Sequence, residues 1–277
     1  MIITALARPP STHNPIQRLR DEKQMKVKFA VLGDTFVDVV AGTLSPEQLP
    51  KWGGDVECSR PIQLQPGGSA LNTATHLANL ATRNPQHELH VALHTVVGFY
   101  SCANLRAKLK PLLEKARAKG ITTSLDTNYD SSEQWTGLEE LFPLLDVFLP
   151  NEVEAMKVSR TQSLEAAMVY FAQRIPGITV IKVGAGGAIA HCSKTQQQWQ
   201  QGSFRTDVVD VTGAGDSFNS GFLSAWKTNG GDVGDALRWG CGTASKTVAA
   251  LGACSFSLAY DDVQTLIATG TVIESTD

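Results

Sequence analysis

The chain has 277 residues with 42% hydrophobic residues, so it is long enough to bury a large core and to form an enzyme domain. Its net charge of −3 provides no basic field for nucleic acid or an anionic membrane, and no apolar run approaches the roughly 20 residues that span a bilayer, so we expect a cytoplasmic protein that binds small molecules. The five cysteines are odd in number and lack a C-x-x-C pair, which indicates reduced thiols and neither a disulfide framework nor a zinc site.

The first 25 residues are expected to be a disordered extension, and the folded domain is expected to span residues 26–277. The stretch 1–24, MIITALARPPSTHNPIQRLRDEKQ, is Pro-rich, polar and aperiodic. It lacks an apolar signal core, and Asp21 and Glu22 count against an organelle transit peptide. Met25 stands directly before a strand-like run and is an alternative start of translation.

Strand-like and helical patterns alternate along the rest of the chain. Most strand-like runs lack polar alternation, as expected in a parallel sheet buried on both faces, and they span residues 27–32, 89–97, 121–125, 147–149 and 179–183. Helical spacing predicts helices over 69–81, 104–120, 163–175, 214–227 and 234–250, the second with a kink or a late start at Pro111. Strand-like pieces within 43–65 indicate a small β appendage. The pattern predicts an α/β fold with a mostly parallel sheet flanked by helices on both faces.

Several common catalytic motifs are absent. The G-x-G pairs at residues 184–186 and 213–215 lack the third glycine of a dinucleotide fingerprint, and no G-x-x-x-x-G-K-[ST] phosphate loop occurs. No G-x-S-x-G elbow of a serine hydrolase occurs either. His90 and His94 lie four residues apart, but on an expected strand with alternating neighbours, so we do not expect a metal site there.

The stretch DVVDVTGAGDSF, residues 207–218, places small residues directly before a carboxylate that opens an apolar helix. Glycines allow successive backbone N–H groups to converge on an anion, and a helix start adds partial positive charge. Asp216 then has two interpretations. It is either a helix cap, or a base that accepts the proton of an attacking hydroxyl beside a phosphate site.

With this stretch extended to DVVDVTGAGDSFNSGF, the sequence resembles the PfkB family of carbohydrate and nucleoside kinases, which have the ribokinase-like fold. The resemblance runs from about residue 26 to the C-terminus. It also rests on further motifs in the family's order: VLGDTFVDVV, PGGSALNTATHLANL, SLDTNYD, PNEVEA and IKVGAGGA. Such a series of motifs in one order is poorly explained by chance.

The resemblance implies that Asp216 is the catalytic base and that Gly213, Ala214 and Gly215 form the anion hole under the transferred phosphoryl group. The positions that match substrate-hydroxyl contacts are Asp38, Gly67, Gly68, Asn72 and Asp210. Carboxylate and amide acceptors suit a polyol, and glycines permit close approach. Two alternatives stay open: Asp38 caps a strand end, and Asn72 is a polar residue on an exposed helix face.

The resemblance also implies sites for ATP and Mg²⁺. The residues that match the nucleotide site are Asn151, Lys182, Gly184 and Gly187, and Glu154 matches the position that orders magnesium, largely through water. The alternative for Glu154 is a solvated acidic helix start. Family members carry a basic residue where this chain has Asp130, which argues against a phosphate contact at that point.

The junction near residues 97–99 departs from the family, because the chain lacks roughly fifty residues there, a gap too large for loop variation. The β lid is expected within residues 38–66, with the remainder missing at 98–99. A full-length form would form a homodimer through this lid. The leading hypothesis is an ATP-dependent phosphotransferase that acts by in-line transfer on a hydroxyl of a sugar or a related small molecule. The alternative is a catalytically impaired, shortened isoform that binds nucleotide or a partner without phosphoryl transfer.

Overall fold

The computed structural model describes residues 2–6, 25–33, 35–40, 63–82, 87–95, 102–127, 130, 133–254 and 258–273. Three expectations fall at least partly outside these ranges: the junction at residues 97–99, residues 7–24 of the N-terminal extension, and residues 41–62 of the expected lid. Within the described part of the chain, no helix is both long enough and apolar enough to cross a membrane.

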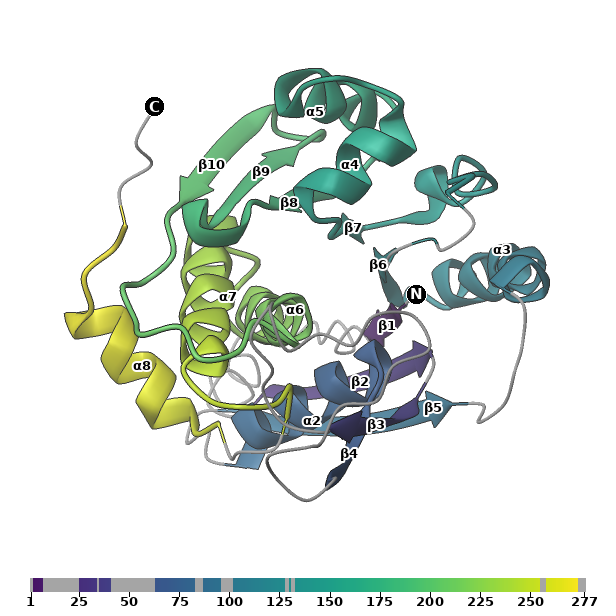
Figure 1. Cartoon of the computed structure of the whole chain (residues 1–277). Helices are drawn as coiled ribbons and strands as arrows, with labels where there is room; N and C mark the ends of the chain where they lie inside the picture. The colour runs from purple at the N-terminus through teal and green to yellow at the C-terminus, as the bar shows by residue number, and fades with distance from the viewer. Residues whose placement is uncertain are drawn as a thin grey trace, which may run out of the picture.

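The described strands form an eight-stranded sheet with the order β10-β9-β8-β7-β6-β1-β2-β5 (Figure 1). Their bounds are Ile2–Leu6 (β1), Met25–Gly33 (β2), His87–Thr95 (β5), Thr122–Asp126 (β6), Val147–Phe148 (β7), Ile178–Lys182 (β8), Ala188–Cys192 (β9) and Gln197–Gln201 (β10). The five predicted strands are confirmed as β2, β5, β6, β7 and β8. The sheet is mixed where we expected a mostly parallel one, because β1 runs antiparallel to both neighbours and β9 and β10 continue from β8 as antiparallel strands.

The N-terminal strand β1 lies between β2 and β6, with Ile3 opposite Leu32 and Ile2 opposite Asp126. The expected disorder of residues 1–25 is therefore wrong for Ile2–Leu6. This run is short and apolar, which suits a buried strand. It was not predicted because the Pro-rich polar stretch that follows it dominates the composition of residues 1–24.

Helices cover both faces of the sheet (Figure 1). The described helices are α2 (Ser69–Thr82), α3 (Cys102–Ala118), α4 (Glu152–Ser159), α5 (Leu164–Ala172), α6 (Ala214–Thr228), α7 (Val233–Val248) and α8 (Tyr260–Thr269). The five predicted helices are confirmed as α2, α3, α5, α6 and α7. α3 runs through Pro111, so it does not start late there. The sequence did not predict the extents of α4 and α8.

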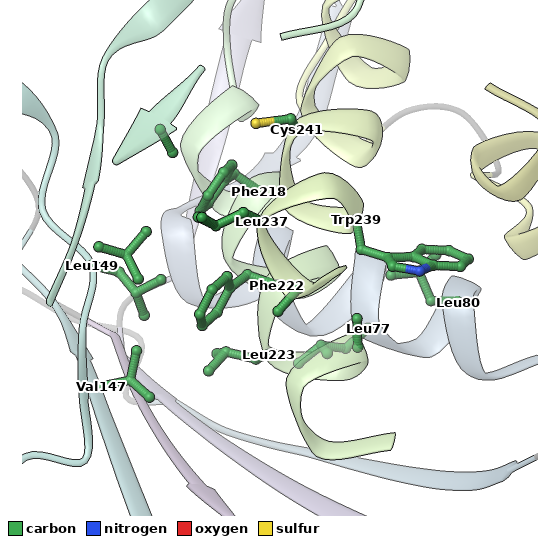
Figure 2. Close-up of a cluster of buried hydrophobic side chains, with 14 of the residues drawn as sticks. Leu77, Leu80, Val147, Leu149, Phe218, Phe222, Leu223, Leu237, Trp239 and Cys241 are labelled. Carbon is green, nitrogen blue, oxygen red and sulfur yellow. The ribbon is translucent and has the colours of Figure 1, made fainter. Parts of the chain in front are cut away.

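Two separate hydrophobic cores follow from the alternation of side chains along the central strands. Val147 and Val180 point into the core shared by α2, α6, α7 and α8, whereas their neighbours Phe148 and Ile181 point into the core under α3, α4 and α5. Figure 2 shows the first core, where Phe218 and Phe222 of α6 stack at 6.2 Å between ring centroids. This packing fixes α6 against the sheet.

A second sheet of two antiparallel strands, β3 (Phe36–Val40) and β4 (Gln63–Gly67), lies within the expected lid region. Its register places Asp38 opposite Gln65 and Phe36 opposite Gly67. Because β4 leads within two residues into α2, the hairpin is anchored at the start of that helix.

Candidate active site

The start of α6 is shaped by Gly213, which takes φ 76° as the N-cap residue. A Cβ at this position would lie 2.7 Å from the Cβ of Ala253 and 2.9 Å from its Cα, so both the backbone angle and the close approach require glycine. The Ala214 N–H donates to the Val211 carbonyl at 3.2 Å. Among the described residues, the N–H groups of Gly215 and Asp216 have no acceptor, as expected in the first turn of a helix. This turn can therefore receive an anion.

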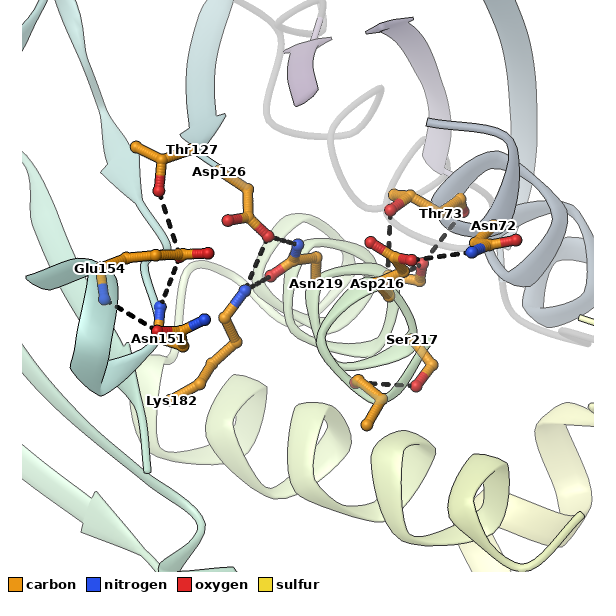
Figure 3. A network of polar contacts seen from close by, with 12 residues as sticks. Asn72, Thr73, Asp126, Thr127, Asn151, Glu154, Lys182, Asp216, Ser217 and Asn219 are labelled. Atoms are coloured by element: carbon orange, nitrogen blue, oxygen red, sulfur yellow. Dashed lines mark hydrogen bonds and ion pairs between the residues drawn. The ribbon is translucent and has the colours of Figure 1, made fainter. Parts of the chain in front are cut away.

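Asp216 is buried in the third position of α6, and its side chain turns toward α2 (Figure 3). Its Oδ2 accepts a hydrogen bond from Asn72 Nδ2 at 2.9 Å, and α6 has no side-chain cap, so the cap interpretation of Asp216 is wrong. Burial raises the pKa of Asp216 to about 7, against the lowering effect of the Asn72 hydrogen bond. A carboxylate with such a pKa can take up a proton near neutral pH.

Asn72 lies in the first turn of α2 and is 4% exposed, so the alternative of an exposed helix face is wrong. Its Oδ1 is buried and has no hydrogen-bond partner in the described part of the chain. A buried amide oxygen in this state needs a donor, and a substrate hydroxyl can provide one. Thr73 and Ser220 join the same two helices, because Ser220 Oγ donates to both the Thr73 and the Asp216 carbonyls.

The glycines that precede α2 lie next to Asn72. Gly68 takes φ 97°, and its carbonyl accepts the Asn72 N–H at 3.0 Å, while Gly67 is the buried last residue of β4. Asp38 lies on β3, two register positions from the pair that includes Gly67, and its side chain is outside the described set. The backbone thus brings the β3–β4 hairpin to the α2 end of the site.

Asp210 has a different surrounding from the other expected substrate contacts. Its Oδ1 accepts from Thr212 N at 2.9 Å and from Thr212 Oγ1 at 2.7 Å, and its Oδ2 accepts from Gly252 N at 2.8 Å. The Thr212 hydrogen bonds lower the pKa of Asp210. With both oxygens engaged, Asp210 holds the turn before Gly213 against the loop at Gly252.

A second carboxylate, Glu154, lies in the third position of α4. Asn151 Oδ1 accepts the Glu154 N–H and Glu154 Oε2 accepts the Asn151 N–H, both at 2.9 Å, which is a reciprocal capping box. Thr127 Oγ1 donates to the same Oε2 at 3.1 Å. Burial raises the pKa of Glu154, and the nearby Asp126 charge adds to this. Glu154 does start an acidic helix, but it is buried, so the solvated alternative is wrong.

Magnesium fits the chemistry of this edge of the sheet. The carboxylates of Glu154 and Asp126 are hard oxygen ligands, and Figure 3 shows the second Glu154 oxygen on the side of Asp126. Within the described ranges no three His, Cys, Asp or Glu side chains converge into a closed metal site. Magnesium commonly keeps several waters and takes only one or two carboxylates, so these residues suit it.

Lys182 ends β8 and lies between Glu154 and Asp216 (Figure 3). Its Nζ is 2.7 Å from Asp126 Oδ2 and 3.3 Å from Asn219 Oδ1, and Asn219 Nδ2 donates to the same Asp126 oxygen at 2.5 Å. The sequence reasoning missed Asp126 and Asn219 as site residues. Both residues could have been singled out from the sequence, because Asp126 lies in the motif SLDTNYD and Asn219 lies in DSFNSGF.

The glycines after Lys182 differ in their surroundings. Gly184 takes φ 58° and a Cβ there would meet no atom within 4 Å, which leaves open space beside it. Gly187 takes φ 88°, and a Cβ there would lie 1.9 Å from the Gln201 carbonyl oxygen, so its glycine is required by packing against β10. Asp130 is buried and accepts the Trp135 N–H at 3.0 Å, so it orders its own loop.

Comparison with known proteins gives a family match over residues 90–259, to the model described as pfkB family carbohydrate kinase. Similar curated proteins include the ribokinase of Staphylococcus aureus, 29% identical over 145 residues (50% of this chain and 46% of the relative), and the 2-dehydro-3-deoxygalactonokinase of Haloferax volcanii, 33% identical over 151 residues (51% and 46%). The chain thus spans about half the length of the curated relatives it matches.

Solved structures extend the likeness at the level of the fold. Arabidopsis thaliana ribokinase, solved with ribose and ATP, has a TM-score of 0.66 at 18% identity and covers 86% of this chain and 97% of its own. Vibrio cholerae fructokinase, solved with fructose, ADP and a calcium ion, has a TM-score of 0.66 at 18% identity over 89% of this chain and 100% of its own. The ribokinase-like fold expected from the motifs is confirmed.

Proposed function

Because the chain belongs to the pfkB family of carbohydrate kinases, we propose that it transfers the terminal phosphoryl group of ATP to a hydroxyl of a sugar or a related small molecule. The observation that carries this proposal is the arrangement at the start of α6. A buried carboxylate with a pKa raised to about 7 directly follows a glycine turn whose Gly215 and Asp216 N–H groups have no acceptor among the described residues. A base and an anion site are thus adjacent.

In the proposed reaction, the attacking substrate hydroxyl lies beside the Asp216 carboxylate. Asp216 takes the hydroxyl proton as the new O–P bond forms, and the bond from the terminal phosphorus to the bridging oxygen of ADP breaks, so ADP leaves with the electron pair. Asn72 holds Asp216 through the 2.9 Å hydrogen bond and offers its buried Oδ1 to a hydroxyl. The Gly213–Gly215 turn stabilises the phosphoryl oxygens through its N–H groups.

The nucleotide is assigned to the carboxyl ends of β7 and β8, where Asn151, Lys182 and Gly184 lie. The open space beside Gly184 admits a ligand, whereas Gly187 supports the turn from β8 into β9. Glu154 would hold magnesium, which when bound neutralises phosphate charge. Lys182 adds a positive charge beside the nucleotide phosphates.

For the substrate, we propose a polyol held by Asn72 together with Asp38, Gly67 and Gly68. The relatives include a ribokinase, a 2-dehydro-3-deoxygalactonokinase and a fructoselysine 6-kinase, so ribose, a deoxy sugar acid and a glycated amino acid define the panel to try. Asp210 is the weakest member of the expected substrate set, because both its oxygens already have backbone or hydroxyl partners.

The alternative is nucleotide binding without transfer, and one observation favours it: the chain matches only about half the length of its curated relatives. Loss of lid segments would expose the reacting groups to water and slow transfer. The two proposals share the nucleotide site and differ in whether a phosphorylated product forms.

The test is to incubate the purified 277-residue chain with ATP, Mg²⁺ and each compound of the panel plus fructose, and to detect product by ³¹P NMR alongside ADP release. A new phosphate-ester signal that is lost in Asp216→Asn supports the kinase. Nucleotide binding by calorimetry without any ester supports the alternative. A chain that shows no nucleotide binding and forms no product would contradict both proposals.

A further inference from the structure

Three elements bring Asp126, Lys182 and Asn219 together at the carboxyl edge of the sheet. Asp126 ends β6, Lys182 ends β8, and Asn219 lies one turn beyond Asp216 on α6. The ion pair is almost wholly inside the protein, with side-chain exposures of 11% for Lys182 and 6% for Asp126. Asn219 bridges the pair, since it accepts from the ammonium at 3.3 Å and donates to the carboxylate at 2.5 Å.

Stability alone is a weak explanation for this trio. Moving both charges out of water carries a large desolvation penalty, and a buried ion pair often stabilises a fold no more than an apolar pair of the same size. The ammonium also lies beside the first turn of α6: a Cβ on Gly215 would be 3.5 Å from Lys182 Nζ. That helix end carries partial positive charge, and Asp126 balances only the ammonium, so a further anion at the turn would be attracted by both the helix end and the ammonium.

The hydrogen bonding of Lys182 leaves room for such an anion. An ammonium group has three donor positions, and the partners it has among the described residues, Asp126 and Asn219, take two. The Lys182 Nζ is 3.5 Å from the place of a Cβ on Gly215, in the turn whose Gly215 and Asp216 N–H groups have no acceptor among the described residues. A phosphoryl group at this turn would accept hydrogen bonds from the ammonium and from these N–H groups.

We propose that Asp126 and Asn219 are positioning residues that hold the Lys182 ammonium beside the Gly213–Gly215 turn, where it meets the terminal phosphoryl group of a nucleoside triphosphate. This inference rests on the proposed function and deepens it. It assigns Lys182 to the phosphoryl group that is transferred, and not to the phosphates that ADP shares with the triphosphate. Without Asp126, the long lysine side chain has no fixed place at the turn.

The test compares the affinities of ADP and of the β,γ-imido analogue of ATP by calorimetry with Mg²⁺ present. Lys182→Met should weaken the imido analogue about tenfold to a hundredfold more than it weakens ADP, the usual effect of one charge-assisted hydrogen bond. Asp126→Asn should also weaken the analogue more than ADP, though by less than Lys182→Met, because the ammonium is still present but is no longer held at the turn, and it should lower kcat at least tenfold.

A matched control is Lys227→Met, which removes another partly buried ammonium between α6 and β6, bonded to Thr122 Oγ1 at 2.9 Å near the far end of α6. It should leave the ratio of the two affinities unchanged. If Lys182→Met fails to fold because Asp126 is left unpaired, the double variant Asp126→Asn with Lys182→Met removes both charges and serves in its place.

Two failures can be told apart. A wild-type chain that binds neither nucleotide contradicts the proposed function, and this inference falls with it. A wild-type chain that binds both, with the same affinity ratio in Lys182→Met or the double variant as in Lys227→Met, contradicts only the placement of Lys182. Equal loss of affinity for ADP and for the analogue would also overturn it, because Lys182 would then contact phosphates common to both.

Discussion

The starts of α4 and α6 carry an acid at the same third position, yet the two acids have different hydrogen-bond partners. In α4, Glu154 turns back to its own N-cap residue Asn151 and closes a capping box. In α6, Asp216 turns away to Asn72 of α2, and the N-cap residue is Gly213, which has no side chain to offer. One helix start is closed by its own side chains, and the other is left open.

In the proposed function, this difference makes the start of α6 the site of the chemistry. A capped start satisfies its backbone donors locally and gains stability. An uncapped start keeps its N–H groups for a ligand and needs stabilisation from packing instead, here from the stacked Phe218 and Phe222 in the core. The position of an acid in a helix therefore does not separate the capping Glu154 from Asp216, the proposed base, whereas the hydrogen-bond partner of each acid does.

The largest expected effect is on catalysis at the open start. Asp216→Asn should lower kcat by about 100- to 10,000-fold, as removal of a general base does, with little change in nucleotide affinity. The matched control is Asp235→Asn, at the third position of α7, whose N-cap Asp232 already accepts the Asp235 N–H. Steady-state rates of ester formation measure both. Comparable rates in the two variants would mean that Asp216 is not the base.

The same substitution should change stability in a pH-dependent way. Asp216 titrates near 3.8 in the unfolded chain and at about 7 in the fold, so folding favours the protonated form. Its contribution to the free energy of unfolding is complete below about pH 4 and is lost as the pH rises through 7, by up to about 4 kcal/mol. Asp216→Asn should thus be more stable than wild type at pH 8 and similar at pH 4, by urea denaturation. A variant that is less stable at pH 8 would contradict the burial of a charged Asp216.

The glycine turn of the open start should be sensitive to a single methyl group. Gly213→Ala adds left-handed strain of about 1–2 kcal/mol and a clash with Ala253 worth about 1–3 kcal/mol more. Gly120→Ala is the control, because Gly120 takes φ 69° and a Cβ added there has no atom within 4 Å. This variant should lose only the stability that the backbone strain costs. Thermal melts of the two variants separate the terms. Equal losses would show that the Ala253 contact relaxes without cost.

Much of this fold could be predicted from the sequence, because buried strands and amphipathic helices leave periodic patterns. Helices α2, α6 and α7 have such patterns, and the residues 213–216 fall where the motif placed them. β1 was missed because a five-residue strand has too little pattern and its pairing with β2 and β6 is decided over long sequence separations.

The site shows the same division. The motifs singled out Asn72, Glu154 and Asp216, but they did not identify the contacts of the site, because Asp216 meets Asn72 across 144 residues and Lys182 meets Asp126 across 56. A local pattern carries no information about such contacts. For the same reason Asp210 and Gly187 were assigned to ligands on motif alone, although their surroundings in the fold give each a structural task.

The smallest expected effect is at the closed start, where Asn151→Ala should remove the cap of α4 and lower the free energy of unfolding by about 0.5–2 kcal/mol. Ser163→Ala is the matched control, since Ser163 caps α5 through the Ala166 N–H at 3.2 Å and should cost a similar amount. Only Asn151→Ala should also weaken Mg²⁺-dependent ADP binding, because it removes the Oδ1 that accepts the Glu154 N–H and so loosens the helix turn that carries the Glu154 carboxylate. Urea denaturation and calorimetry measure the two effects. If both variants lose the same stability and neither changes ADP binding, the closed start serves α4 alone and takes no part in the nucleotide site.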